Sequence, residues 1–399
     1  MTNKDLNIIN VTPDMSIQKV VDSAEVGSTI ILSAGEYTGE GNNNIRINKE
    51  NLTIKGIEEG KIIINATETE NNVFNITGDN TTLENLIITQ SNGVNSTVII
   101  KSKNNTIKKC TFENNIIEGV KGFGGAIFNI ESDLIVNQCT FTNNTAAHGG
   151  GAIISEKGNL TIAESIFSNN KTESDGGAIF NRKGDLIVKQ CTFIGNKAGY
   201  GGAILNSKGN STVIDSTFTD NRSKFGGAIE NSGDLTVRQS TFTDNKVEIG
   251  GGAVTNSGDL TVNQSTFADN KAKVGGGAIM SAEGDLTVNQ CTFTNNKARI
   301  GGTIANSNGN SIVIDSTFTD NRSKEYGGAI INGNGNLIIT ESIFTDNKSE
   351  ISAGAIDNIG GDLTVRQSKF INSDVFHNND KITRNYKSNK IVIQDSTFN

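Results

Sequence analysis

Carboxylates that interrupt an otherwise repetitive sequence are the first candidates for acid–base chemistry. They are Glu156, Glu173, Asp175 and Glu230. An enzyme that cleaves polysaccharides needs clustered carboxylates as acids, bases or calcium ligands, together with an Arg or Lys. None of the four has an evident partner of this kind in the sequence, and ordinary charge on a solvated face accounts for each of them.

The two histidines, His148 and His377, are the other candidates for proton transfer. His148 precedes a glycine run at 149–151, which indicates an exposed corner. A lone histidine in such a place is more often an ordinary surface residue. No Cys/His cluster has metal-ligand spacing. We therefore expect no catalytic residue, no cofactor and no metal site, with calcium as the one ion to consider.

Acidic residues recur at one position of the repeat and would stack into a column. Stacked carboxylates are suited to calcium. A basic residue follows each of them two positions later, which favours a charge-balanced solvated edge. The acidic residues are Asp220, Asp244, Asp269, Asp320 and Asp346, and the basic ones are Arg222, Lys246, Lys271, Arg322 and Lys348.

Threonines on both sides of a repeated Phe form a second regular pattern. If the Phe points inward, these hydroxyls form a flat outward array, which resembles that of ice-binding solenoids. Threonine is also simply a good strand residue on a wet face. The pairs are Thr140/Thr142, Thr217/Thr219, Thr241/Thr243, Thr292/Thr294 and Thr317/Thr319, with interruptions at Ile166, Ile194, Ala268 and Lys369.

The four cysteines each occupy one repeated position, in C-T-F where other coils read S-T-F. They are Cys110, Cys139, Cys191 and Cys291. Because Cys and Ser alternate at this position, we expect it to hold a small side chain that points mostly inward. Because Cys110 and Cys139 are one coil apart, a disulfide between them is geometrically conceivable.

Two repeating motifs predict the strands and turns that position these residues. Phe recurs at intervals of 24–29 residues from Phe112 to Phe398, and a GGA[ILV] motif recurs beside it. A period near 25 residues indicates a solenoid. The repeat residues that we select as structural are Phe141, Asn144, Gly150, Gly151 and Ile153, then Phe242, Asn245, Gly251, Gly252, Val254 and Asn256, and finally Phe318 and Asn321.

One coil, residues 233–256, contains three short extended segments separated by turns. Strand alternation places Leu235 and Val237 inward, then Ser240 and Phe242, then Val254 and Asn256. The variable residue between the last two is expected to face outward. Asn245 is expected at a left-handed corner, whereas stacked Asn256-type amides should bond one another. The Gly pair permits a turn that a Cβ would block. This pattern predicts an all-β fold, a single-stranded parallel β-helix.

The ends of the chain depart from the repeat. Residues 1–34 are predicted to form an N-terminal cap, in which Asp14 or Ser16 caps a short helix with Ile17, Val20, Val21 and Ala24 on its apolar face. Residues 35–399 form the β-helix, regular over about 110–371, with an irregular loop or cap over about 372–390. Because the sequence stops within a coil, we expect a segment of a larger protein.

GGA[ILV] paired with FxxN resembles the repeat of the polymorphic outer-membrane proteins. The matches run from Gly124-Gly125-Ala126-Ile127 to Gly327-Gly328-Ala329-Ile330, with mild departures at 301–304 and 353–356. The resemblance implies a right-handed β-helix, an adhesin role, and an extracellular or cell-surface location. It implies as partners a host or neighbouring cell surface, including its glycans. The opening stretch, SIQKVVDSA to LTIKG at 16–56, resembles the entry to pectin-lyase-like β-helices and supports the same fold. No signal peptide, anchor or membrane span is visible in the sequence.

The composition narrows the partners further. The 399 residues carry a formal net charge of −8 and a pI near 5.1, which argues against sequence-independent nucleic-acid binding. The leading hypothesis is a non-enzymatic surface adhesin or stalk. The alternative is a carbohydrate-active β-helix enzyme such as a polysaccharide lyase, and a minor alternative is ice binding by the Thr ladder.

Overall fold

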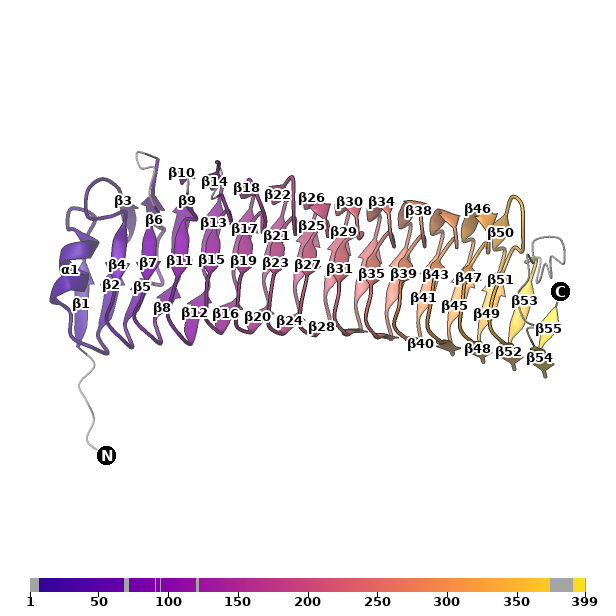
Figure 1. Ribbon diagram of the computed structural model, residues 1–399. Coiled ribbons are helices and arrows are strands. Elements are labelled where there is room, and N and C mark those ends of the chain that lie inside the picture. The colour runs from indigo at the N-terminus through magenta and orange to yellow at the C-terminus, as the bar shows by residue number, and fades with distance from the viewer. Residues whose placement is uncertain are drawn as a thin grey trace, which may run out of the picture. The chain divides into compact units, whose positions relative to one another are not determined.

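The computed structural model describes residues 7–67, 72–89, 91–93, 95–119, 122–373 and 390–398. The chain groups into two compact units, Met1–Gly199 and Tyr200–Asn399, which we describe separately. Each unit is a parallel β-helix in which a strand pairs with the equivalent strand of the next coil (Figure 1). Each coil has four strand positions, which we name after a typical residue. In one coil, the Leu strand is β32 (Leu235–Arg238), the Phe strand is β33 (Thr241–Thr243), the Lys strand is β34 (Lys246–Ile249) and the Ile strand is β35 (Val254–Asn256).

The first unit contains the single helix of the described residues, α1 (Ile17–Ser23), and strands of all four kinds. Its Leu strands are β1 (Ile8–Val11), β2 (Thr29–Leu32), β5 (Thr53–Gly56), β8 (Thr82–Glu84), β12 (Asn105–Lys108), β16 (Leu134–Asn137), β20 (Leu160–Ala163) and β24 (Leu186–Lys189). Its Phe strands are β3 (Gly35–Tyr37), β6 (Ile62–Asn65), β9 (Ile87–Thr89), β13 (Thr111–Glu113), β17 (Thr140–Thr142), β21 (Ile166–Ser168) and β25 (Thr192–Ile194). Its Lys strands are β10 (Asn92–Gly93), β14 (Ile116–Ile117), β18 (Thr145–Ala146), β22 (Lys171–Thr172) and, at the boundary, β26 (Lys197–Tyr200). Its Ile strands are β4 (Ile45–Ile47), β7 (Phe74–Ile76), β11 (Val98–Ile100), β15 (Ile127–Asn129), β19 (Ile153–Ser155) and β23 (Ile179–Asn181).

The second unit repeats the same four strands with greater regularity. Its other Leu strands are β28 (Ser211–Ile214), β36 (Leu260–Asn263), β40 (Leu286–Asn289), β44 (Ser311–Ile314), β48 (Leu337–Thr340), β52 (Leu363–Arg366) and β54 (Ile391–Gln394). Its other Phe strands are β29 (Thr217–Thr219), β37 (Thr266–Ala268), β41 (Thr292–Thr294), β45 (Thr317–Thr319), β49 (Ile343–Thr345), β53 (Lys369–Ile371) and β55 (Thr397–Phe398). Its other Lys strands are β30 (Arg222–Phe225), β38 (Lys271–Val274), β42 (Lys297–Ile300), β46 (Arg322–Tyr326) and β50 (Lys348–Ser349). Its other Ile strands are β27 (Ile204–Asn206), β31 (Ile229–Asn231), β39 (Ile279–Ser281), β43 (Ile304–Asn306), β47 (Ile330–Asn332) and β51 (Ile356–Asn358).

The three predicted segments of the coil are all strands, and the Lys strand is an addition to them. The segment after the T-D-N turn, for example Lys246-Val247-Glu248-Ile249, is not among the three predicted segments. In the second unit it pairs in parallel with its neighbours, Lys246 opposite Lys271 and Ile249 opposite Val274. Backbone pairing between identical rungs therefore extends the strand pattern into a segment whose side chains are largely exposed.

The interior of each unit is a stack of identical side chains. Phe242 and Phe267 are fully buried, with ring centroids 4.8 Å apart and planes within 1°. The first unit repeats this arrangement, since Phe141 and Phe167 lie 4.7 Å apart. Parallel in-register pairing places every Phe on the one before it, and the stacked rings contribute favourable contacts beyond their burial.

Buried asparagines form hydrogen-bonded ladders beside the Phe stack. Asn245 Nδ2 donates to Asn270 Oδ1 at 3.0 Å and to the carbonyl of Phe218 at 2.9 Å. The expectation of a left-handed corner at Asn245 is wrong, because the preceding residue, Asp244, has φ 56° and makes the corner. The Asn245 side chain is instead buried, where its amide forms hydrogen bonds with the polar groups of neighbouring coils. The Asn256 ladder forms as predicted, since Asn231 Nδ2 donates to Asn256 Oδ1 at 2.7 Å.

The glycine pair is required by the closeness of successive coils. A Cβ on Gly251 would lie 2.0 Å from the carbonyl oxygen of Val254, and one on Gly252 would lie 2.1 Å from that of Gly277. Across this turn, the backbone N–H groups of Ala253 and Val254 both donate to the carbonyl of Ala278, each at 2.9 Å. Any side chain would disrupt these bonds, as the sequence indicated.

The variable residue of the Ile strand faces away from the interior but is not always solvated. Phe180 and Leu205 are 7% exposed and Ala305 is 6% exposed. The glycine turns cover this row: a Cβ on Gly149 would lie 2.9 Å from Phe180 Cδ1. The variability of this position therefore shows that it lies on the outer side of the coil, but not that its side chain is exposed to solvent.

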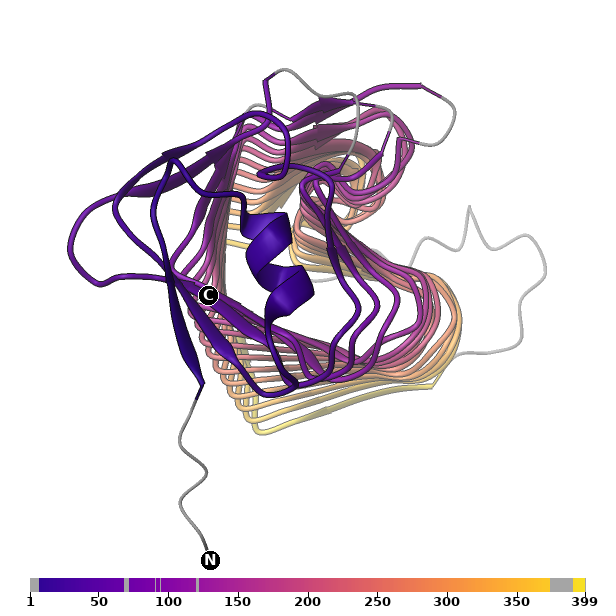
Figure 2. The same ribbon diagram turned by 90° about the vertical axis from the view of Figure 1, so that its left-hand side faces the viewer.

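The helix α1 lies over the interior of the first coils (Figure 2). Ser16 is its N-cap and accepts from the Lys19 backbone N–H at 3.2 Å, while Ile17 and Val21 are fully buried. Lys49 donates from Nζ to the carbonyls at its C-terminal end, including that of Val21 at 2.9 Å. The predicted cap helix is present. At the other end, β54 pairs with β52, and most of the predicted irregular segment (374–389) lies outside the described residues.

Candidate functional site

The structural repeat residues lie inside the coils, where they hold the rungs together. Phe141, Asn144, Gly150, Gly151 and Ile153 are buried in the first unit. Phe242, Asn245, Gly251, Gly252, Val254, Asn256, Phe318 and Asn321 are buried in the second. None of them presents a side chain to solvent, so any ligand must meet other residues.

The carboxylates selected as catalytic candidates in the first unit each have a basic neighbour. Glu156 accepts two hydrogen bonds from Arg182 Nη1, both at 3.0 Å. Glu173 forms an ion pair with Lys171 at 3.1 Å. Burial raises the pKa of Asp175, and a hydrogen bond from Ser174 and the charge of Arg182 oppose that rise. The Glu156–Arg182 contact joins neighbouring coils and the Lys171–Glu173 contact lies within one coil, and neither brings three carboxylates together.

The remaining candidates lie apart from these. Glu230 belongs to the second unit, where it packs against Gly226: a Cβ on that glycine would lie 2.4 Å from Glu230 Cβ. His148 is exposed and contacts Phe123, with ring centroids 5.7 Å apart. His377 lies outside the described residues. Within the described part of the chain, no three His, Cys, Asp or Glu residues are grouped so as to hold a metal ion.

The acidic column of the second unit is only partly balanced by the basic one. Asp220 forms ion pairs with Arg222 at 3.0 Å and with Lys246 of the next coil at 3.7 Å, and Asp320 pairs with Arg322 at 3.9 Å. Asp269 instead accepts a hydrogen bond from the Asn295 amide. The coil of Lys297 therefore has an amide, that of Asn295, at the position where the neighbouring coils have the carboxylates of Asp269 and Asp320. Calcium binding by this column stays a prediction.

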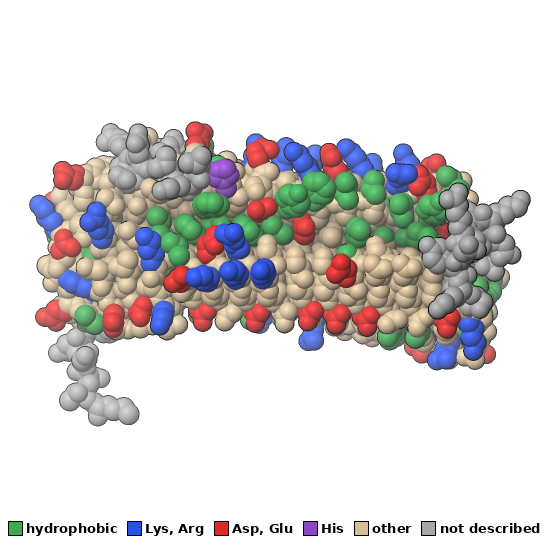
Figure 3. Space-filling model, in the orientation of Figure 1, with side chains coloured by type: hydrophobic (Ala, Val, Ile, Leu, Met, Phe, Trp, Pro, Cys, Tyr) green, Lys and Arg blue, Asp and Glu red, His purple; other side chains and the backbone are tan. Residues whose placement is uncertain are grey.

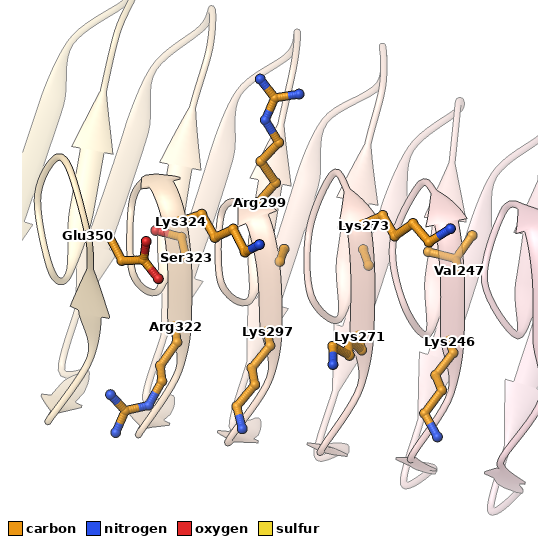
Figure 4. A pocket seen from close by; sticks show the side chains of 12 residues that line it. Lys246, Val247, Lys271, Lys273, Lys297, Arg299, Arg322, Ser323, Lys324 and Glu350 are labelled. Atoms are coloured by element: carbon orange, nitrogen blue, oxygen red, sulfur yellow. The ribbon is translucent and has the colours of Figure 1, made fainter.

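A hollow of about 750 Å³ follows the Lys strands of the second unit and is a candidate binding site. One bordering column contains Lys246, Lys271, Lys297 and Arg322, which lie side by side along one edge in Figure 4. The other contains Lys273, Arg299, Lys324 and Glu350. Between them lie Val247, Ala272, Ala298 and Ser323, whose side chains are buried, so the strands themselves form the floor.

The charge of this hollow is strongly basic. Seven of its lining residues are Lys or Arg, and Glu350 is the one acid. Lys273 pairs with Glu248 at 3.1 Å, and Arg299 pairs with Glu325 at 2.7 Å, which raises the pKa of Arg299. Lys271 and Lys297 have no acidic partner at ion-pair distance in the described part of the chain.

Sequence reasoning treated these cations as a balanced edge and did not single out Lys297. Two signals pointed to the hollow. The coil at 294–297 reads TNNK, with Asn295 in place of the usual Asp, and basic residues recur two apart in KAK, KAR and RSK at 271–273, 297–299 and 322–324. On a strand, residues two apart share a face, so this spacing places two basic rows on one surface.

An exposed apolar row, formed by the last residues of successive Lys strands, runs beside the second basic column. Phe225 is 37% exposed and Ile249 is 47% exposed, and they pair across neighbouring coils. Tyr200 stacks on Phe225 with centroids 4.9 Å apart. Val274, Ile300 and Tyr326 continue the row with partial exposure. Figure 3 shows apolar side chains gathered in a band below basic ones over this part of the surface.

The threonines on the Phe strands form the expected outward rows. Thr241, Thr266 and Thr292 pair in register and are exposed. Ile343 replaces Thr in this row two coils further on, beyond Thr317. The row is regular but narrow.

The four cysteines are buried, and none of them is in a disulfide. Cys139 Sγ accepts a weak hydrogen bond from the Cys110 backbone N–H at 3.4 Å. Burial raises the pKa of Cys191 and of Cys291 to about 11 in each case. The thiol therefore packs as a small inward group, as the alternation with Ser predicted.

Comparison with known proteins places the chain in a family. The model of the right-handed β-helix region matches residues 40–215 and 197–318, so the chain belongs to the right-handed β-helix family and its coil has that hand. The model of the Chlamydia polymorphic membrane protein repeat matches residues 315–333, in agreement with the motif resemblance. No curated protein matches the chain.

Solved structures with a similar fold include polysaccharide lyases. One is an alginate lyase of family 6 in complex with a trisaccharide (TM-score 0.41, 10% identity, 100% of this chain and 86% of that chain covered). Another is a mannuronic-acid-specific family 6 lyase from the human gut microbiota (TM-score 0.44, 11%, 97% and 91%). A third is ORF18 of Geobacillus virus E2 (TM-score 0.40, 14%, 76% and 61%). At these TM-scores the similarities say nothing of activity or ligand.

Proposed function

We propose that the protein is a non-enzymatic, adhesin-like binding protein of the cell surface or extracellular space. The observation that carries the proposal is that its outward side chains form rows repeated coil after coil, for example Lys246, Lys271 and Lys297. A repeated row offers many equivalent weak contacts to an extended partner, which together bind tightly. A catalyst needs one unrepeated constellation instead.

The candidate acids support the same proposal. Glu156 and Glu173 are each engaged in an ion pair with a basic side chain, whereas an acid–base catalyst needs a carboxyl group that can reach its substrate. The polymorphic membrane protein repeat at 315–333 supports a location at the surface. No helix of the described residues is long and apolar enough to cross a membrane. The partner would then be a host or neighbouring cell surface or its glycans.

Retention and cleavage of polysaccharides, measured together, test the proposal. The full chain is incubated with immobilised plant, algal and animal glycans, with and without calcium, and both bound protein and new chain ends are quantified. Retention without new ends is expected. Formation of unsaturated or reducing ends would instead identify a carbohydrate-active enzyme, which is the alternative function, and would refute this proposal.

A further inference from the structure

We infer that the basic hollow on the second unit binds a linear acidic polysaccharide whose chain runs along the stacked coils. This inference rests on the proposed binding function and names its ligand class. The hollow is defined by the residues between Lys246 and Glu350 that line it. It extends over the Lys strands β34, β38, β42 and β46, and its long direction is set by the stacking of those strands.

The basic row along one edge of the hollow carries unbalanced positive charge. Lys246, Lys271, Lys297 and Arg322 are in register on successive strands, so like charges stand about 4.8 Å apart by strand spacing. Like charges directly opposite each other on paired strands repel and destabilise the pairing. Two members of the row, Lys271 and Lys297, have no acidic partner among the described residues. An external anion relieves this repulsion, and the chain itself does not supply one there.

The spacing of the basic row fits the spacing of charges along an acidic polysaccharide. A rung of about 4.8 Å is close to the length of one extended sugar ring, so a uronic acid polymer offers about one carboxylate for each basic residue of the row. Duplex DNA carries one charge for about every 1.7 Å of its axis, several per rung. This charge density of DNA exceeds what the basic row can neutralise. The acidic column at Asp220 and Asp244 and the net charge of −8 also repel a polyanion of such density.

An apolar row runs beside the second basic column. Its most exposed members, Tyr200, Phe225 and Ile249, are each between 37% and 47% exposed and lie on the coils that lead up to that column. Val274 and Ile300 continue the row, with partial exposure, next to the basic residues of the column. Sugar rings combine polar edges with apolar C–H faces, and partly exposed aromatic and aliphatic side chains pack against such faces. A basic row beside an apolar row fits a polymer that carries both features in every unit.

Binding of polygalacturonate and of its fully methyl-esterified form tests the inference, because the two polymers share a backbone and differ in charge. The full chain is applied to each immobilised polymer over a series of NaCl concentrations. The charged polymer should bind, with affinity that falls as salt rises, and the ester should bind at least about tenfold more weakly. Equal binding of the two polymers would overturn the inference.

Matched charge variants locate the site. Lys271→Glu with Lys297→Glu should weaken binding of polygalacturonate by about tenfold or more, because repulsion replaces attraction. Lys183→Glu with Lys208→Glu changes the net charge equally at exposed positions outside the hollow and should leave binding within about twofold. The double Gln variant at 271 and 297 should also bind more weakly, which separates loss of attraction from misfolding. Equal effects of the two Glu pairs would refute the site.

The remaining outcomes separate this inference from the proposed function. Retention of neutral glycans alone would leave the adhesin-like function standing and refute the acidic ligand. Release of unsaturated ends from polygalacturonate would refute the non-enzymatic function itself. A short DNA duplex serves as the competing class: tighter binding of the duplex, lost in the 271/297 variant, would show that the hollow takes nucleic acid and overturn the polysaccharide.

Discussion

At the scale of single residues, the buried amides decide how one rung recognises the next. Asn270 donates from Nδ2 to Asn296 Oδ1 at 3.1 Å and to the Phe242 carbonyl at 2.9 Å. Its own Oδ1 accepts from the backbone and side chain of Asn245. Every polar atom of this amide is therefore used, and a shift of register by one residue would break all of these bonds at once.

Replacing Asn270 with Ala should destabilise the protein by about 2–4 kcal/mol, because it leaves buried donors and acceptors without partners. The urea midpoint, followed by far-UV circular dichroism, measures the loss. Thr243→Ala is the control, since the residue paired with Thr243 in the next coil is already Ala268. Equal midpoints for the two variants would show that the ladder contributes nothing to stability.

The buried thiols make stability depend on alkaline pH. Burial raises the pKa of Cys191 and Cys291 from an ordinary value of 9.0 to about 11. The folded state thus holds these protons more tightly, so their contribution is fully present below about pH 9 and is lost as the pH rises to about 11. Native protein should also resist thiol reagents at pH 8.

Comparison with Cys191→Ser/Cys291→Ser isolates that contribution. Other coils have Ser here, and Ser240 Oγ donates to the Arg238 carbonyl at 2.8 Å, so the variant should fold. Its urea midpoint should fall less steeply than that of the parent protein between pH 9 and 11. Identical pH profiles, or rapid labelling of the native thiols, would contradict the buried state.

At the scale of elements, the coil is built from four strands joined by tight turns. The left-handed corner before each buried Asn is made by Asp or Asn, as at Asp244 with φ 56°, or by Gly, as at Gly195 before Asn196. The glycine turn meets the next coil so closely that even a methyl group would collide with its backbone. Sequence pattern identified the glycines correctly but placed the Asn corner one residue too late, because both neighbours are turn-forming types.

Gly252→Ala should therefore disrupt pairing between neighbouring coils. The new Cβ would lie 2.1 Å from the Gly277 carbonyl oxygen and 2.8 Å from the Lys271 nitrogen, and neither backbone atom can move freely. We expect a loss of at least about 2 kcal/mol, measured from the urea midpoint. Ser232→Ala, at an exposed corner, should change stability by less than about 0.5 kcal/mol. A Gly252 variant as stable as this control would show that the turn tolerates a side chain.

At the scale of the whole molecule, a stack of paired strands must end without exposing an open edge. In the first unit, α1 packs on β1 and β4 and buries Ile17 and Val21. An uncovered end presents unpaired backbone groups that another copy can join. The cap therefore keeps the solenoid from associating end to end.

Ile17→Asp with Val21→Asp should detach α1 and cause self-association that grows with protein concentration, because buried charges cannot remain under the helix. Sedimentation velocity across a concentration series measures this. Lys19→Ala alters an exposed residue of the same helix and should leave the sedimentation coefficient unchanged. A detached cap without association would mean that the coil end is protected by other residues.

The sequence by itself determined the coil and its stacked interior. Residues that recur at a fixed interval must occupy equivalent places, so the Phe stack, the Asn256 ladder and the glycine turn were all predictable from Phe242, Asn256 and Gly252. The N-terminal cap helix followed from the spacing of Ile17, Val20 and Val21 and from Ser16 before them.

Only the tertiary structure decided which repeated polar residues are paired and which are free to bind. Lys246 reaches back to Asp220 in the preceding coil, whereas Lys271 and Lys297 find no acid within the described residues. Likewise, Phe180 lies on the outer side of its coil yet is covered, while Ile249 is exposed. Periodicity states which residues are equivalent, but ion pairing and solvent exposure depend on distances between neighbouring coils, and these are set by packing.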